Sequence, residues 1–184
     1  MNKRYPSDLQ KRYANTVFPN LPNELIVEIL INTDNKTFND LCYEPEFQSY
    51  CSENSVFSER IYEERAKRAS LKIYAKDLTD LKPREMTWRE FYYMVDRDPV
   101  LRLKDIFESF YDPVPEYILE HSDNPEMGKF KNIIKMRTGI VIGIGYGENR
   151  EEARLNAAKV AIDHLKRHNI DPENVLREKI KRYR

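Results

Sequence analysis

Glycine is absent from the first 127 residues of this 184-residue chain, and all five glycines lie between Gly128 and Gly147. Glycine is needed where the backbone turns with positive φ or lies very close to another backbone. Sharp turns and close approaches are therefore expected in one short segment. Residues 143–147, followed by the sequence Glu-Asn-Arg-Glu-Glu-Ala-Arg, predict a tight junction between a strand and an alanine-rich helix. Arginines at such a helix N-terminus are suited to facing phosphate groups.

The chain also has few cysteines, no long apolar run and no excess of either charge. The two cysteines, Cys42 and Cys51, are too few for a disulfide framework, and we expect buried thiols in a reducing cytosol. No apolar run approaches the roughly 18 residues that would cross a bilayer, and no apolar segment follows the first residues. We therefore expect neither membrane insertion nor secretion, but a cytoplasmic protein.

The net charge is zero, because 31 basic residues balance 31 acidic ones. Bulk charge therefore does not indicate a nucleic-acid-binding protein, and any such binding must depend on local placement of cations.

The first half of the sequence favours short helices. Residues 1–20 form an arm rich in basic and aromatic side chains, and residues 21–95 contain no glycine. Apolar residues recur at helical spacing after Pro22, which suits a first helical turn. The first stripe comprises Leu25, Ile26, Ile29 and Leu30. Thr87 is an expected cap for a later helix that carries the only tryptophan.

In the second half the spacing of apolar residues changes. The pattern over residues 97–169 predicts an α+β domain. Asp98 and Pro99 open a helix, and residues 116–121 favour a strand. Residues 130–137 and 139–145 predict a hairpin rich in isoleucine. A helix over residues 149–169 carries alanines on one stripe, which let it lie close to a sheet. Asp171 caps a further C-terminal helix over residues 171–184.

Residues 97–169 resemble a double-stranded-RNA-binding domain, a family with the order α-β-β-β-α. The residues that match its pattern, in order, are Pro99, Leu103, Asp105, Tyr117, residues 124–127, Phe130, Gly145, Gly147, residues 149–151, Ala153, Arg154, Ala157 and Ala158. Such domains read the shape of A-form RNA over about 16 base pairs, through two minor grooves and the phosphates between them. The resemblance implies a helix contact from Lys104 and Asp105, a loop contact from Pro125 and Met127, and a phosphate contact from Asn149, Arg150 and Arg154.

Two positions depart from the family's pattern. Met127 replaces a histidine in the loop, and Glu151 replaces a basic residue in the phosphate-binding cluster. Arg150, Glu151 and Arg154 therefore sum to +1 instead of +3, and we expect weakened binding. Lysines 129, 131 and 135 either compensate or form the solvated side of a strand.

The helical half resembles the F-box-like motif found in proteins of large DNA viruses. The matching residues are Leu21, Pro22, residues 24–26, residues 28–30, Leu41, Cys42, Phe47, Tyr50, Cys51 and Phe57. The resemblance implies docking on a Skp-type adaptor of a ubiquitin ligase through Leu21, Pro22, Leu25 and Ile29. The residues alone fit equally well a helical domain that packs only its own core.

The sequence contains no recognisable catalytic, cofactor or metal site. His164 and His168 have a spacing that can hold zinc, but no further ligand accompanies them at a recognisable spacing. We therefore expect a non-enzymatic RNA-binding protein without cofactors. The alternative is an interaction scaffold or ubiquitin-ligase adaptor, in which a degenerate RNA-binding fold pairs with protein, or with a second copy, through the sheet face around Val141 or through the terminal helix.

Overall fold

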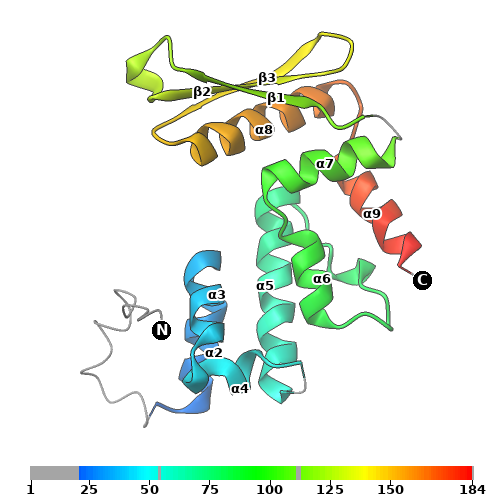
Figure 1. Ribbon diagram of the computed structural model, residues 1–184. Helices are drawn as coiled ribbons and strands as arrows, with labels where there is room; N and C mark the ends of the chain where they lie inside the picture. The colour runs from blue at the N-terminus through cyan, green and yellow to red at the C-terminus, as the bar shows by residue number, and fades with distance from the viewer. Residues whose placement is uncertain (1–20, 54, 111–112, 184) are drawn as a thin grey trace, which may run out of the picture. The chain divides into compact units, whose positions relative to one another are not determined.

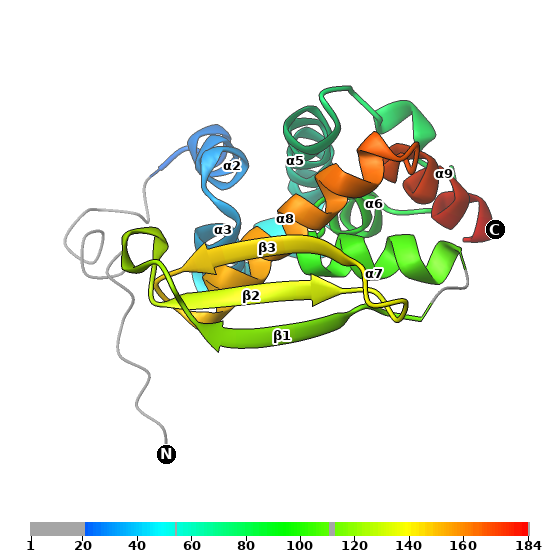
Figure 2. The same cartoon turned by 90° about the horizontal axis from the view of Figure 1, so that it is seen from above.

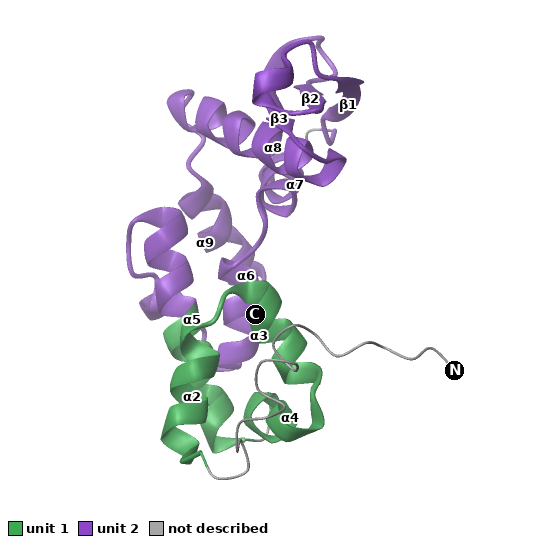
Figure 3. Ribbon diagram, turned by 90° about the vertical axis from the view of Figure 1, so that its left-hand side faces the viewer, with its two compact units in different colours: residues 1–65 green, residues 66–184 purple. Residues whose placement is uncertain are grey.

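The computed structural model describes residues 21–53, 55–110 and 113–183. The basic and aromatic arm predicted for residues 1–20 lies outside the described residues. The chain divides into two compact units, residues 1–65 and 66–184, and the boundary falls within helix α5 (Val56–Tyr74) (Figure 3). Residues 66–95 thus belong to the same unit as the sheet.

The described part of the first unit is helical, as predicted. It comprises α2 (Asn23–Asn32), α3 (Asn35–Tyr43), α4 (Pro45–Cys51) and the first turns of α5. Asp34 starts α3, because its carboxylate accepts a hydrogen bond from the Thr37 N–H. The predicted apolar stripe of α2 is shifted around the helix: Ile26, Val27, Leu30 and Ile31 are buried, whereas Leu25 is 49% exposed.

A buried arginine connects α5 to the end of α2. The Arg65 guanidinium donates to the carbonyl oxygens of Leu30 at 2.7 Å and Thr33 at 2.9 Å, and to Asn35 Oδ1 at 2.7 Å. It also lies 3.9 Å from the centre of the Phe38 ring. Arg65 therefore satisfies carbonyl groups that the end of a helix leaves without partners.

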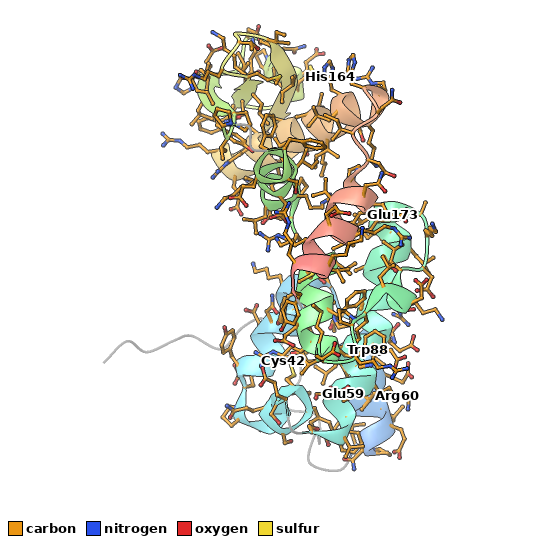
Figure 4. The ribbon with its side chains drawn as sticks, turned by 90° about the vertical axis from the view of Figure 1, so that its right-hand side faces the viewer. Cys42, Glu59, Arg60, Trp88, His164 and Glu173 are labelled. Atoms are coloured by element: carbon orange, nitrogen blue, oxygen red, sulfur yellow. A yellow bond between two sulfur atoms is a disulfide. The ribbon has the colours of Figure 1, made fainter. Side chains whose placement is uncertain are left out.

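Cys42 and Cys51 form a disulfide, which corrects the expectation of free thiols. Cys42 lies near the end of α3 and Cys51 at the end of α4, and the chain turns between these helices at Glu44 and Pro45 (Figure 4). The turn brings the two Cα atoms to 5.6 Å, within the range that a disulfide requires.

The second unit combines helices with one antiparallel sheet. After α5 come the 3₁₀ turn η2 (Thr79–Leu81), α6 (Trp88–Val95) and α7 (Pro99–Ser109). The predicted caps are confirmed. Thr87 and Glu90 form a reciprocal capping box on α6, and the Asp98 carboxylate accepts hydrogen bonds from two N–H groups of α7.

Three strands follow in the order β1-β2-β3, namely β1 (Glu116–His121), β2 (Phe130–Lys135) and β3 (Val141–Gly147). The short turn η3 (Pro125–Met127) lies between β1 and β2. Helices α7 and α8 (Arg150–Arg167) lie on one face of the sheet, and α9 (Pro172–Arg182) follows (Figures 1 and 2). The order predicted for residues 97–169, a helix, three antiparallel strands and a helix, is confirmed.

Glycines and alanines bring β3 and α8 into backbone contact. A Cβ atom added at Gly145 would lie 2.6 Å from the Ala153 carbonyl oxygen and would overlap the Ala157 backbone nitrogen. A Cβ at Gly143 would lie 2.9 Å from the Ala161 methyl group. The close contact between strand and helix, which the glycines and the alanines predicted, is thus present. The core beneath the sheet comprises Leu103, Ile106, Phe107, Ile134, Ile142, Ala157, Ala158, Ala161, Ile162, Leu165 and Val175.

Candidate nucleic-acid interface

The start of α8 carries the predicted phosphate-contact residues. The Asn149 side chain caps the helix by accepting a 2.8 Å hydrogen bond from the Glu152 N–H. The Glu152 carboxylate in turn accepts the N–H of Glu148 at 2.9 Å. Asn149 and Glu152 thus complete the helix end, while Arg150 and Arg154 are left to face solvent.

Both arginines are held over aromatic rings of the sheet. The Arg150 guanidinium lies 5.8 Å from the centre of the Phe130 ring, and that of Arg154 lies 4.9 Å from the Tyr117 ring. Neither guanidinium has an acidic partner within the described part of the chain. A cation over a ring face is attracted without being neutralised, so both charges stay available to an anion.

Tyr117 remains a neutral platform at ordinary pH. Burial raises the pKa of its phenol, and this effect outweighs the opposite influence of Arg154. Glu151 is exposed and lies about 100° around the helix from Arg150. Its carboxylate therefore lowers the local positive potential without forming an ion pair to either arginine.

The loop between β1 and β2 presents Pro125 and Met127 to solvent. Met127 is 54% exposed. The loop is closed by a 3.0 Å hydrogen bond from the Ser122 N–H to the Lys129 carbonyl, and Asn124 accepts the Glu126 N–H. Gly128 has φ +127°, and a Cβ there would lie 2.6 Å from the Gly147 backbone. The loop is thereby fixed against the end of β3, next to the start of α8.

The neighbouring lysines contribute little free charge. Lys131 lies 3.1 Å from Asp123 Oδ2 and 3.9 Å from Glu120, and its side chain is 16% exposed. The hydrogen bond between Lys131 and Asp123 raises the pKa of the lysine and lowers that of the carboxyl. Lys129 is paired with Glu148 at 3.4 Å. Lysines 129 and 131 therefore do not offset Glu151.

The two predicted contacts on α7 have different environments. Lys104 is exposed and forms a 3.4 Å pair with Glu108 on the same helix. The Asp105 carboxylate is only 11% exposed and lies 2.7 Å from Lys179 Nζ and 2.8 Å from Arg97 Nε. Asp105 thus belongs to an internal ion cluster, and its carboxylate is too buried to contact a ligand at the surface.

One further residue joins the arginines. His121 stacks on Phe130, with ring centroids 5.7 Å apart, on the same ring that attracts Arg150. No sequence pattern singles out this histidine, because its contact depends on the register that pairs His121 with Phe130 across two strands.

The histidine pair and the predicted docking residues of α2 lie apart from these arginines in the sequence. The rings of His164 and His168 lie 4.6 Å apart, and within the described residues no group of three metal-ligating side chains is found. Figure 4 shows His164 on α8. On α2, Pro22 and Leu25 are exposed, while Leu21 and Ile29 are half-buried. No helix in the described ranges has the length and apolar character to span a bilayer.

Comparison of the chain with protein-family models, with curated proteins and with solved structures finds no match.

Proposed function

We propose that residues 97–169 bind double-stranded RNA by its shape, without catalysis. The observation that carries the proposal is the pair Arg150 and Arg154, which project from the start of an 18-residue helix and have no acidic partner among the described residues. Phosphate oxygens are favoured there by the guanidinium charges, the helix dipole and the free N–H groups of the first turn.

Two other segments extend this surface. The exposed loop residues Pro125 and Met127 are suited to a minor groove, whose wide, shallow floor in RNA admits an apolar tip beside 2′-hydroxyl groups. Lys104 supplies a further cation from α7. The low local charge, with Glu151 exposed and two lysines paired, supports moderate affinity with a shallow dependence on salt.

A duplex-binding titration tests the proposal. Fluorescence anisotropy with an RNA duplex of about 20 base pairs and a DNA duplex of the same sequence, at several salt concentrations, should show preference for RNA. Arg150→Gln or Arg154→Gln should each lower the slope of log affinity against log salt by about one unit. The matched control is Arg167→Gln, which removes the same charge in the last turn of α8. Equal binding to RNA and DNA, or an equal loss in the control, would reject the proposal.

Variants that restore the family's residues at positions 151 and 127 test why the affinity for RNA should be weak. Glu151→Lys replaces a repelling carboxylate with a cation, and Met127→His restores a hydrogen-bond donor at the loop tip. We expect the double variant to bind the RNA duplex more tightly, with a salt slope steeper by about one unit from the lysine alone. A wild-type protein that already binds as tightly as the variant would contradict this explanation.

The outer sheet face favours a second candidate function, an interaction scaffold. The register places Ile118, Ile133 and Ile144 side by side across the three strands, on the face opposite the helices. Ile144 is 40% exposed and Val141 is 45% exposed. A self-associating scaffold should give a concentration-dependent mass in light scattering that Ile144→Lys abolishes. A monomer at every concentration would exclude this role for the sheet.

The F-box-like surface of α2 is a protein-docking candidate of the same class. Its support is the outward position of Pro22 and Leu25 on a helix whose other side is buried. Binding to a purified Skp-type adaptor should be lost in Leu25→Asp and kept in Leu71→Asp, which changes a leucine of similar exposure on α5. Equal binding of both variants would exclude α2 as the docking helix.

A further inference from the structure

A small cavity lies where α9 crosses α7. Its volume is about 20 Å³, and its polar lining consists of Tyr74, Arg97, Arg102, Asp105 and Lys179. Met94, Ile106 and one apolar face of α9, at Pro172, Val175 and Leu176, complete the wall. The polar lining thus contains three cations and one carboxylate, and it lies away from the arginines at the start of α8.

The charges around this cavity do not balance. Asp105 is contacted by both Lys179 and Arg97, so its single negative charge is more than neutralised. Arg102 has no ion pair among the described residues, and its Nε is buried without a hydrogen-bond partner. Arg97 Nε lies 2.8 Å from Asp105 but its N–H is not directed at the carboxylate, so this donor is also unused. Buried N–H donors without partners are costly, and an anion would accept from both guanidinium groups.

The size of the cavity selects the kind of anion. One water-sized sphere needs about 10–15 Å³ of such space, so about 20 Å³ fits a single-atom anion such as chloride. We propose that this cavity binds one chloride ion between the Arg97 and Arg102 guanidinium groups, near the Lys179 ammonium group, and that the ion holds α9 against α7. Tyr74 does not supply the missing negative charge, because burial raises the pKa of its phenol to about 12.

Thermal unfolding of the full chain tests the proposal. The midpoint should be about 2–4 °C higher in sodium chloride than in sodium gluconate of equal ionic strength, the shift expected when chloride is present at about five times its dissociation constant. Arg102→Gln removes the unpaired cation, so its midpoint should be the same in both salts. Arg137→Gln is the control, because it removes an exposed arginine from the turn between β2 and β3.

A second measurement does not depend on the variant's folding. Crystals of the wild-type protein grown in sodium bromide should give an anomalous peak in the cavity, because bromide replaces chloride. An equal wild-type midpoint in chloride and gluconate, or a cavity without a bromide peak, would overturn the proposal in favour of a bound water molecule. A chloride effect that persists in Arg102→Gln would also overturn it, since the ion would then bind elsewhere as an adventitious ion only.

Discussion

Gly145 of β3 and Ala157 of α8 are in backbone contact, with no space for a methyl group on the glycine. Side chains normally keep a helix and a sheet further apart. Here the contact is made by residues with one side-chain carbon or none, so the distance between α8 and the sheet is set by the main chain.

Gly145→Ala should therefore be strongly destabilising. The added methyl group would overlap the Ala157 nitrogen and lie 2.6 Å from the Ala153 carbonyl oxygen, neither of which can rotate away. We expect the free energy of unfolding in urea to fall by at least about 2–3 kcal/mol. Ile144→Val, one residue earlier on the outer face, should cost less than about 0.5 kcal/mol, because Ile144 is 40% exposed. Similar losses for the two variants would show that the helix moves aside easily.

Arg65→Met should destabilise the first unit by about 2–4 kcal/mol. The methionine fills most of the volume, but the carbonyl groups of Leu30 and Thr33 would lose a charged donor in a buried place. Denaturant unfolding followed by circular dichroism measures this loss. The control is Arg60→Met on the same helix, whose guanidinium forms only an exposed 3.4 Å pair with Glu28. That change should cost less than about 1 kcal/mol, and an equal cost would contradict a special role for Arg65.

Reduction of the disulfide should also lower stability. The bond between Cys42 and Cys51 closes a short loop, with a sequence separation of 9, and the loop-entropy relation gives about 2–3 kcal/mol for a loop of that size. Thermal unfolding with and without a thiol reductant measures the difference. The Cys42→Ser, Cys51→Ser double variant should unfold at the same temperature in both buffers. An equal unfolding midpoint of the wild-type protein with and without reductant would contradict a stabilising disulfide.

Acid should loosen the start of α9 through Glu173, which Figure 4 labels. Hydrogen bonds from Arg177, then Lys76, outweigh desolvation and hold the pKa of the Glu173 carboxyl below its ordinary 4.5. A carboxyl with a lowered folded-state pKa stabilises the protein above its ordinary pKa, and this contribution is lost as pH falls through the folded-state value.

Glu173→Gln should thus lower stability by about 0.5–1 kcal/mol at neutral pH and make no difference below the folded-state pKa. Unfolding midpoints measured from pH 7 to about pH 3 test this convergence. Parallel pH profiles for wild type and variant would contradict it. Glu178→Gln is the control, because Glu178 is more exposed and pairs only with Lys181 in the same helix.

Local chemistry explains what the sequence predicted well. The caps at Thr87, Asp98 and Asp171 each start a helix where expected, because a cap acts within three residues of itself. The glycine and alanine pattern also predicted the contact between β3 and α8, since two small-residue surfaces leave little else to separate them.

Contacts between distant residues explain what the sequence did not predict. Asp105 is withdrawn from the surface by Lys179, 74 residues later, and no local pattern predicts that pair. Lys131 is neutralised by Asp123 across the β1–β2 loop. The buried face of α2 was ambiguous, because six of its ten residues are aliphatic and form two overlapping apolar stripes. Which stripe is buried depends on packing with other helices. The disulfide depends on the turn between α3 and α4, which two cysteine positions alone do not reveal.

The glycine and alanine seam has a consequence for recognition. Because main chain rests on main chain, α8 has no rotamer change by which it could slide along β3. The backbone at Arg150 and Arg154 is consequently held at one position relative to the sheet. A ligand of both arginines therefore has to fit the backbone positions that the sheet sets.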